Sequence, residues 1–269
     1  MHKARKQIEA AMPRIDVVIE VLDARLPASS SNPMLAELRG DTPCVRVLSK
    51  PDLADPETTK GWLAELARDE GVSAVALDCR SRRDARKLPA ACRRLAPHRG
   101  TILKPLRVMV AGIPNVGKST LINTLRGKRV AKVGDVPALT RGQQRVEVDE
   151  GFVISDTPGV LWPKLDDQEG AKRLAASGAI RDSAMDRETI ALYVADWLRT
   201  HYPERFLERF KLSEIPESGL DALEAVGRKR GCVGKGAEVD WMKASDVLLR
   251  ELRAGKIGRI SYEVAPEPA

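Results

Sequence analysis

One segment of the chain carries the residue pattern of a phosphate-binding loop. Residues 112–119 read Gly-Ile-Pro-Asn-Val-Gly-Lys-Ser, which fits the pattern G-x-x-x-x-G-K-[ST]. Glycines let such a loop turn tightly, so that its backbone N–H groups converge on phosphate oxygens. Lys118 would bring its positive charge to the β- and γ-phosphates, and Ser119 would ligate Mg²⁺. A strand-like run, 106–111, precedes the loop and a helical pattern, 120–125, follows it, so the sequence predicts a nucleotide site.

Two further segments could complete a magnesium site and act as switches. Asp156-Thr157-Pro158-Gly159 directly follows the strand-like run 152–155. A carboxylate at the end of a strand can hold Mg²⁺, usually through water, while a glycine N–H reaches the γ-phosphate. Thr140 lies in a polar loop, 134–143, from which a threonine can close over the metal when a γ-phosphate is present. These features predict an NTPase in which Lys118, Thr140 and Gly159 serve catalysis and Ser119, Thr140 and Asp156 hold Mg²⁺.

A base-binding motif precedes the phosphate loop. Ser49-Lys50-Pro51-Asp52 follows the strand-like run 44–48. GTPases usually carry Asn-Lys-x-Asp, whose aspartate accepts two hydrogen bonds from guanine N1–H and N2–H₂, and adenine offers no such pair of donors. Asp52 therefore predicts a preference for guanine, although Ser49 makes the match imperfect. A helical pattern, 58–70, and a strand-like run ending at Leu77-Asp78-Cys79 follow, which is where a GTPase places its second base-contacting loop.

The order of these motifs differs from that in an ordinary GTPase, because the base motifs come before the phosphate loop. Base site, phosphate loop and switches in this order describe a circularly permuted GTPase, in which the same sheet is cut at a different loop. The predicted nucleotide contacts come from all of these segments: Ser49, Lys50, Pro51, Asp52, Asp78, Cys79, Asn115, Val116, Gly117, Lys118, Ser119, Thr120 and Gly159.

The elements that must position these residues alternate between strands and helices. Strand-like runs lie at 15–22, 44–48, 72–77, 106–111, 145–148 and 152–155, with helical patterns at 33–39, 58–70, 82–95 and 118–125. Such alternation predicts a mostly parallel sheet with helices on both faces. After about residue 182 only helical spacing remains, at 189–198, 220–226 and 244–253. We therefore expect an α/β domain, 1–181, followed by a small all-α domain, 182–269.

Composition excludes several classes of protein. The chain has 269 residues, of which 43% are apolar and 31% charged, as in ordinary globular proteins. Its apolar runs are far shorter than the roughly 20 residues of a spanning helix, and no signal peptide is evident. We therefore expect a cytoplasmic protein without a membrane partner. The four cysteines have wide spacings and no C-x-x-C pair, which favours reduced thiols over disulfides or a zinc site.

The basic residues are unevenly distributed. Residues 80–107 hold ten basic side chains against one acid, Asp84, whereas the whole chain has a net charge of only +7. A polyanionic partner would relieve the mutual repulsion of such a stretch, although it could also be a solvated face. Aromatic residues make up only 4%, so phosphate contacts and shape would dominate any nucleic-acid binding. The candidate RNA contacts are Arg82, Arg83, Arg86 and Lys87, and a second cluster of Arg228, Lys229, Arg230 and Lys235.

Taken together, these motifs resemble those of the ribosome biogenesis GTPase A family. The matching segments are Asp23-Ala24-Arg25-Leu26-Pro27, 30–33, 112–123, 156–163, 200–205 and 227–232, which span nearly the whole chain. The resemblance implies a permuted GTPase domain followed by a helical domain similar to RNA-binding antiterminator modules. It implies GTP hydrolysis coupled to late maturation of the large (50S) ribosomal subunit, with rRNA and ribosomal proteins as partners. We expect the chain to act as a monomer.

The chain departs from the family pattern at several positions. Family members carry Asn at Ser49, commonly Asn-Ser at Asp78-Cys79, and Gly at Ala138, which predicts weaker nucleotide affinity with GTP preference retained. The histidine proposed to assist water attack in relatives would precede residue 1. Val160 stands where many small GTPases place a water-orienting glutamine, so we expect slow hydrolysis that the ribosomal partner or an ion completes. Asn115 stands where K⁺-stimulated relatives coordinate potassium.

Three alternatives to an assembly GTPase remain open at this stage. The chain could be a nucleotide-gated rRNA-binding module for which hydrolysis is incidental. It could be a permuted NTPase that uses ATP, because Ser49 replaces the usual asparagine. It could also be an inactive switch, because Val160 cannot orient water.

Overall fold

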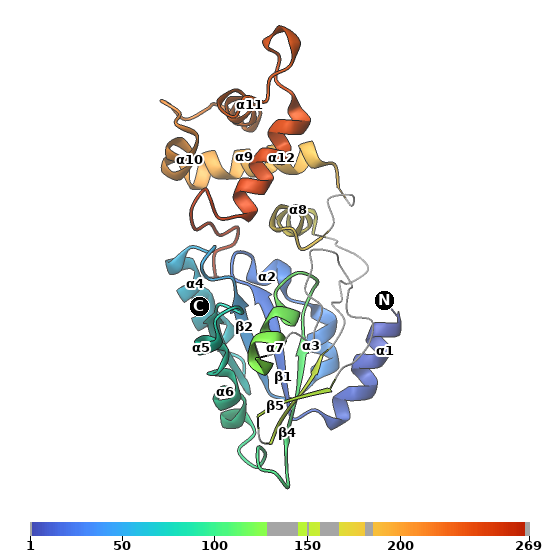
Figure 1. Ribbon diagram of the computed structural model, residues 1–269. Helices are drawn as coiled ribbons and strands as arrows, with labels where there is room; N and C mark the ends of the chain where they lie inside the picture. The colour runs from blue at the N-terminus through green and yellow to red at the C-terminus, as the bar shows by residue number, and fades with distance from the viewer. Residues whose placement is uncertain (1, 128–144, 150, 157–166, 181–184, 267–269) are drawn as a thin grey trace. The chain divides into compact units, whose positions relative to one another are not determined.

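The structure is a computed structural model that describes residues 2–127, 145–149, 151–156, 167–180 and 185–266. The chain divides into two compact units, labelled in Figure 1 by their helices and strands. The sheet unit comprises Met1–Asp166 together with Ser261–Ala269, and the helical unit comprises Asp167–Ile260. Thr140 and Gly159, which the sequence places in the switches, lie outside the described residues.

The sheet unit is built on six strands in the order β3-β2-β1-β4-β6-β5. All neighbouring pairs are parallel except β5 with β6, which is antiparallel. The strands are β1 (Val17–Asp23), β2 (Cys44–Ser49), β3 (Val72–Leu77), β4 (Leu106–Ala111), β5 (Arg145–Asp149) and β6 (Phe152–Asp156). The mostly parallel α/β fold predicted from the sequence is confirmed.

The central strand shows why this sheet must be covered on both faces. All seven residues of β1 are buried, including Glu20 and Asp23, which matches its mostly apolar sequence and the usual burial of parallel strands. In the register of the sheet, Asp23 at the end of β1 lies beside Ser49 at the end of β2. The order of strands reverses between β1 and β4, and ligands of open α/β sheets bind beyond the carboxyl ends of strands at such a point.

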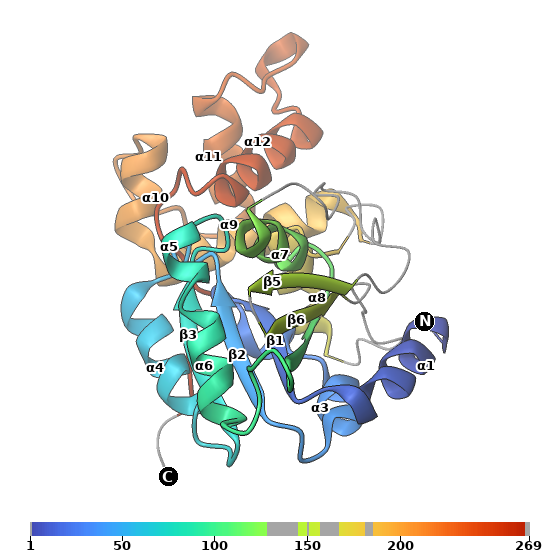
Figure 2. The same cartoon turned by 60° about the horizontal axis from the view of Figure 1, so that its bottom comes forward.

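Helices supply that cover (Figures 1 and 2). On one face, Met12 and Leu35 pack with Val18, and Trp62 packs with Leu48. Elsewhere α6 contacts β2, and α7 contacts β5 and β6. The helical elements of the sheet unit are α1 (His2–Ala11), η1 (Met12–Arg14), α2 (Pro27–Ser30), α3 (Pro33–Arg39), α4 (Pro56–Leu66), α5 (Arg82–Ala85), α6 (Leu88–Leu95) and α7 (Lys118–Arg126).

Caps and prolines set the helix boundaries. The Asp55 side chain accepts hydrogen bonds from the backbone N–H groups of Glu57 and Thr58 at 3.1 and 3.2 Å, so α4 begins earlier than its apolar pattern suggests. The single helix predicted over 82–95 is wrong, because the structure has two helices there, α5 and α6. Pro89 has no N–H and its ring would clash with the preceding turn of a continuous helix. It is instead placed in the first turn of α6.

The helical unit contains α8 (Gln168–Ser177), α9 (Arg187–His201), α10 (Pro203–Phe210), α11 (Gly219–Lys229), η3 (Lys235–Ala237) and α12 (Trp241–Arg253). The central helix is α9, which contacts α8, α10, α11 and α12. Val194 and Leu198 of α9 are buried in this core with Phe206 of α10. Within the described residues of the chain, no helix combines the length and apolar character needed to cross a membrane.

The division into units differs from the boundary expected between residues 181 and 182. Helix α8 already belongs to the helical unit, and residues 261–269, expected in that unit, belong to the sheet unit instead. We refer to residues 261–266 as the return segment. The Tyr262 N–H donates to the carbonyl oxygen of Arg25 at 2.7 Å, and the Trp62 indole N–H donates to the carbonyl oxygen of Glu263 at 3.1 Å. These contacts join residues that lie far apart in the sequence, so no hydrophobic periodicity could predict them.

The carboxylate of Glu263 is the strongest anchor of the return segment. It is only 7% exposed and accepts hydrogen bonds from the backbone N–H groups of Ala28 at 2.7 Å and Ser29 at 3.0 Å, and from the Ser29 hydroxyl. These N–H groups belong to the first turn of α2, where no intrahelical acceptor is available. A negative charge is favourable there because the helix N-terminus is partially positive.

We predict that Glu263→Gln lowers the thermal stability of the sheet unit, because a neutral amide cannot replace a charged acceptor of several hydrogen bonds. The expected loss is about 1.5–3 kcal/mol, the usual range for hydrogen bonds to a charged group. Differential scanning calorimetry of the full chain would measure it, and amide hydrogen exchange would show faster exchange at Ala28 and Ser29. Glu70→Gln, at an exposed acid, is the matched control. Equal melting of the two variants would contradict the prediction.

Candidate nucleotide site

The phosphate loop turns at the carboxyl end of β4 in a backbone conformation that requires glycine. Gly112 has a φ of 143°, and a Cβ added there would lie 2.5 Å from the carbonyl oxygen of Val21 on β1. Gly117 has a φ of 109° and directly precedes α7. Since L side chains rarely adopt such angles, both glycines of the motif are required by the path of the chain. The loop therefore places the N-terminus of α7 at the switch point of the sheet, where a phosphate would be favoured.

The residues that follow Gly117 are placed to meet a phosphate group. Lys118 is 7% exposed, and its ammonium donates to the carbonyl oxygen of Ile113 at 2.7 Å, which directs it across the loop. Ser119 and Thr120 lie half-buried in the first turn of α7. Asn115 has a φ of 58°, a conformation that asparagine adopts more readily than most residues. The serine hydroxyl is an oxygen ligand of the kind that Mg²⁺ prefers.

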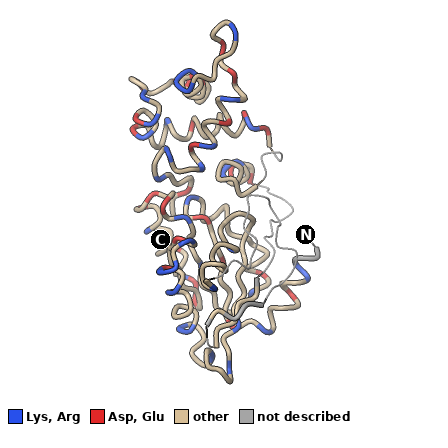
Figure 3. The backbone as a smooth tube through the Cα atoms, in the orientation of Figure 1, with Lys and Arg blue, Asp and Glu red and all other residues tan. Residues whose placement is uncertain are grey.

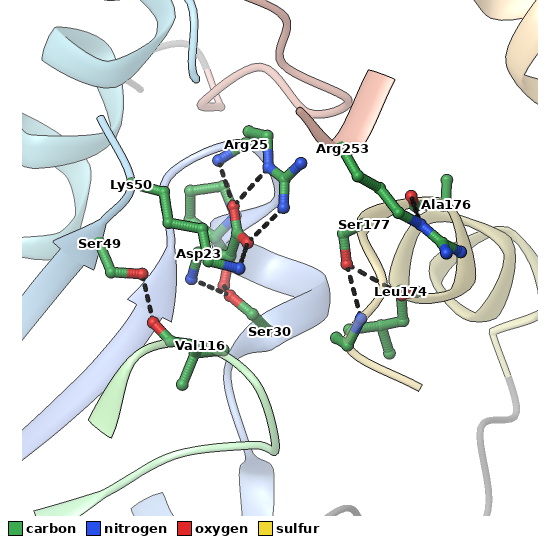
Figure 4. A network of polar contacts seen from close by, with 12 residues as sticks. Asp23, Arg25, Ser30, Ser49, Lys50, Val116, Leu174, Ala176, Ser177 and Arg253 are labelled. Atoms are coloured by element: carbon green, nitrogen blue, oxygen red, sulfur yellow. Dashed lines mark hydrogen bonds and ion pairs between the residues drawn. The ribbon is translucent and has the colours of Figure 1, made fainter. Parts of the chain in front are cut away.

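The two predicted base loops meet the phosphate loop directly. The fully buried Ser49 hydroxyl donates to the carbonyl oxygen of Val116 at 2.6 Å (Figure 4). A Cβ added at Gly117 would lie 3.3 Å from the Cys79 sulfur and 3.9 Å from the Ser49 Cβ. Burial raises the pKa of the Cys79 thiol to about 12, so this group packs as a neutral side chain. Ser49 therefore joins the base loop to the phosphate loop through its hydroxyl.

Behind these loops lies a buried cluster of charges that the sequence analysis did not interpret. The carboxylate of Asp23, only 1% exposed, accepts from Arg25 Nε at 2.9 Å and Nη2 at 2.8 Å (Figure 4). It also accepts from Lys50 Nζ at 2.9 Å, and its own backbone N–H donates to the Ser30 hydroxyl at 3.0 Å. Lys50 is the second residue of the Ser-Lys-Pro-Asp motif and has a φ of 54°. The ion pair therefore fixes the start of the base loop to the end of β1.

The charges of this cluster depend on one another. Burial alone would raise the pKa of the Asp23 carboxyl, but the adjacent charges of Arg25 and Lys50 outweigh it and hold that pKa well below its usual range. Burial likewise opposes the charge on Arg25, yet the Asp23 carboxylate raises the pKa of the guanidinium above its ordinary value. The sequence contains one signal for this cluster. It is an acid and an arginine that stand two residues apart at the end of a strand.

Asp52 and Asp78, one from each base loop, are bridged by a residue that was not among the predicted contacts. Arg80 Nη2 lies 2.8 Å from Asp52 Oδ2, and Arg80 Nε lies 2.9 Å from Asp78 Oδ1. Hydrogen bonding from Arg80 lowers the pKa of Asp78 below its ordinary value. Pro51 lies between Lys50 and Asp52 in the same turn. Asp52 and Asp78, expected at the base, thus face one another through a single guanidinium.

Asp156, which the sequence predicts to hold Mg²⁺, is the last residue of β6. In the register of the sheet it lies beside Val110 of β4, one residue from the end of the strand that leads into the phosphate loop. The backbone thus brings Asp156 to the edge of the sheet at which α7, with Ser119 in its first turn, begins. An oxygen-donating serine and an aspartate at this edge fit the requirements of Mg²⁺, which prefers oxygen ligands.

The predicted RNA contacts fall into two groups with different surroundings. Arg82, Arg83, Arg86 and Lys87 are exposed on and directly after α5, although Lys87 is paired with Asp84 at 2.7 Å. In the helical unit, Lys229 and Lys235 are exposed, and Arg228 is paired with Glu224 at 2.7 Å.

Arg230 differs from the other members of this cluster. Its guanidinium lies 2.9 Å from Glu251 Oε1 and 4.9 Å from the centroid of the Phe210 ring. Arg209 pairs with the same carboxylate at 2.8 Å. Glu251 is only 7% exposed, so these pairs join α10, α11 and α12 around a nearly buried charge. Arg230 thus stabilises the packing of the helical unit.

A phosphate loop at the switch point of a parallel sheet, with base loops contributed by strands that precede it in the chain, defines a circularly permuted P-loop GTPase. Comparison with known proteins agrees, because the family described as "50S ribosome-binding GTPase" matches residues 107–218. The chain belongs to the ribosome biogenesis GTPase A family. It is therefore a GTP hydrolase of large-subunit assembly, as predicted from its motifs.

Individual relatives match the chain along nearly its whole length. The ribosome biogenesis GTPase A of Bacillus cereus is 42% identical, with 99% of this chain and 92% of that protein covered. The protein of the same name from Thermotoga maritima is 32% identical, with 98% and 91% covered. The crystal structure of GNP-bound YlqF from T. maritima is similar with a TM-score of 0.68 and 27% identity, over 99% of this chain and 100% of that one.

We predict that Asp23→Asn destabilises the sheet unit, because it leaves the buried charge of Arg25 and the half-buried charge of Lys50 without their carboxylate. The expected loss at pH 7 is about 3–5 kcal/mol, as for other broken buried ion pairs. A lowered carboxyl pKa stabilises the fold fully above its unfolded value of about 3.9 and progressively less below it. The difference between wild type and variant should therefore narrow as the pH falls below about 4.

Urea denaturation at pH 7 and at a series of pH values down to 3 would measure this difference. Asp41→Asn changes an exposed aspartate of the same unit and serves as the control. A loss that is equally large at pH 7 and pH 3 would show that shape, and not the charge of Asp23, accounts for the effect.

Proposed function

We propose that this chain binds GTP and Mg²⁺ at the carboxyl edge of its sheet and hydrolyses GTP to GDP and phosphate in late maturation of the large ribosomal subunit. The observation that carries this proposal is the contact between the base loops and the phosphate loop. Ser49 and Cys79 lie against Val116 and Gly117, although they come from segments far apart in the sequence. A nucleotide that spans from a base site to a phosphate site requires this proximity.

In this proposal, different residues of the chain bind the phosphates, the base and Mg²⁺. Backbone N–H groups of residues 115–120 and the Lys118 ammonium bind the β- and γ-phosphates. Asp52 reads the base, with residues 49–51, Asp78 and Cys79 forming the rest of its pocket. Ser119, Thr140 and Asp156 hold Mg²⁺, which neutralises charge on the phosphates when bound. Gly159 contacts the γ-phosphate through its N–H.

Hydrolysis by the isolated chain should be slow, because Val160 cannot orient water. We assign the missing stabilisation of transition-state charge to the ribosomal subunit and to K⁺ held near Asn115. The left-handed conformation of Asn115 supports this assignment, because it turns the phosphate loop sharply at that residue. An asparagine oxygen is a neutral ligand of the kind that a monovalent cation accepts.

The partner in this proposal is a precursor of the large subunit, reached in the cytoplasm by a monomer. The exposed cations of α5 and the following turn support an rRNA contact, and the last turn of α6 adds Arg93 and Arg94. Figure 3 shows the distribution of Lys and Arg along the backbone. Lys229 and Lys235 offer a second exposed pair in the helical unit. Arg228 and Arg230 mainly stabilise the fold beneath this second surface. Arg228 does so partly through Nη1, which donates to the carbonyl oxygen of Ala237 at 3.2 Å.

We predict that Lys118→Ala abolishes GTP hydrolysis, because it removes the charge that compensates the phosphates. Hydrolysis of GTP and of ATP would be measured for both proteins with and without 50S subunits, in KCl and in NaCl. Wild type should hydrolyse GTP in preference to ATP, and 50S subunits and K⁺ should each raise its rate. Near-normal turnover by Lys118→Ala would contradict the site. GTP turnover that 50S subunits leave unchanged would favour a nucleotide-gated rRNA-binding module instead.

We also predict that reversing the charge of Arg82, Arg83 and Arg86 to Glu weakens association with large-subunit precursors. Wild-type association should fall steeply with salt, and the variant should show a smaller salt dependence because fewer counterions are released. Sedimentation with precursor particles at several KCl concentrations would measure both. Reversing Arg14, Lys60 and Arg68, exposed cations elsewhere on the sheet unit, changes the net charge equally and serves as the control. Equal weakening by both triple variants would indicate a general effect of charge.

A further inference from the structure

The base-reading carboxylate of the proposed site already has a partner within the chain. Arg80 Nη2 donates to Asp52 Oδ2 at 2.8 Å, in an ion pair whose side chains are 66% and 43% exposed. The contact therefore lies on an exposed part of the site.

A guanidinium and a guanine base compete for the same acceptors. Guanine presents N1–H and N2–H₂ side by side, and a carboxylate accepts both with its two oxygens. Arginine presents a planar fork of N–H donors with a similar spacing, which also pairs with carboxylates. Arg80 Nη2 therefore occupies an acceptor position on Oδ2 of Asp52 for which an incoming base would compete.

Asp78 gives Arg80 a second place to bind. Arg80 Nε lies 2.9 Å from Asp78 Oδ1 and 3.2 Å from Oδ2, and Nη2 lies 3.1 Å from Oδ2. The backbone N–H of Arg80 also donates to Asp78 Oδ1 at 2.9 Å. Arg80 can therefore release Asp52 and keep its charge compensated by Asp78, so that displacement removes one ion pair only.

We propose that Arg80 is a specificity- and affinity-determining residue that competes with guanine for Asp52 and so lowers the affinity of the site for guanine nucleotides. The inference rests on the proposed role of Asp52 in reading the base. Base binding and the Arg80–Asp52 pair compete with each other, whereas the Arg80–Asp78 pair persists in both cases. Asp78 is thus the residue that holds Arg80 close to the base site.

The size of the effect follows from the exposure of the pair. Exposed ion pairs contribute little free energy, which corresponds to roughly 1.5- to 5-fold in an equilibrium constant. Loss of a positive charge near a bound nucleotide would by itself weaken anion binding. Arg80→Gln is therefore expected to tighten GDP binding about two- to fivefold, in the direction opposite to that of a general loss of charge.

The test is the dissociation constant of the full chain for GDP, measured by isothermal titration calorimetry for wild type and Arg80→Gln. Arg126→Gln, an exposed arginine at the end of α7, is the matched control for loss of one charge. Arg80→Gln should tighten GDP binding, Arg126→Gln should not, and the affinity for ADP should not rise in either variant. Unchanged or weaker GDP binding by Arg80→Gln, or an equal gain for ADP, would overturn the inference.

A second experiment, in the Asp52→Asn variant, tests the contact with Asp52 by itself. Asp52→Asn replaces the carboxylate with an amide that does not attract a guanidinium and that can donate to the C2 carbonyl of xanthine. In this background Arg80→Gln should leave the affinity for xanthosine diphosphate unchanged, whereas the same gain as in wild type would overturn the inference. Failure of wild type to bind GDP would overturn the proposed site as well. Tight GDP binding without the gain would overturn the competition alone.

Discussion

The buried carboxylate of Asp23 is the constraint on which this site depends. A charge that is 1% exposed at the end of a central strand must be compensated by groups that the chain holds in fixed positions. Arg25 and Lys50 provide that compensation, and each belongs to a loop with further contacts. Through Lys50 the carboxylate fixes the base loop. Through Arg25 it fixes the loop whose carbonyl oxygen accepts from Tyr262, so one anion orders both the site and the return segment.

The two covalent connections of the helical unit both lie close, along the chain, to segments of the proposed nucleotide site. The helical unit is an insertion in the sheet unit, which the chain leaves after Asp166 and re-enters at Ser261. One connection follows the segment that carries Gly159, and the other leads directly into contacts with Arg25 and with Asp55, whose N–H donates to the Ser261 hydroxyl at 3.1 Å. Both covalent links of the helical unit therefore start from segments next to nucleotide-binding loops.

Local signals in the sequence were sufficient to predict the strands and helices of the fold but not its polar contacts. The ranges 72–77, 106–111 and 33–39 are those of β3, β4 and α3, because an apolar run or a cap with a proline is encoded within a few residues. The phosphate loop was predicted for the same reason. The Ser49–Val116 bond and the anchoring of Glu263 join residues 67 and more than 200 positions apart, and no periodicity records such a pairing. The bridging position of Arg80 was missed because it depends on how two loops face each other.

The departures from the family pattern at the base site differ in their effects. One concerns the packing of the loops, and the other concerns the charge of the base pocket. Replacing asparagine by Ser49 shortens the side chain, yet the serine hydroxyl still reaches the Val116 carbonyl at 2.6 Å, so the loops stay joined where they meet the phosphates. Asp78 adds a negative charge, and that charge holds Arg80 in reach of Asp52. The loop geometry is thus preserved while the electrostatics of the base pocket change. In the proposed site, Asp52 sets the preference for guanine, and the competition of Arg80 for Asp52 reduces both the affinity for guanine nucleotides and the margin over adenine nucleotides.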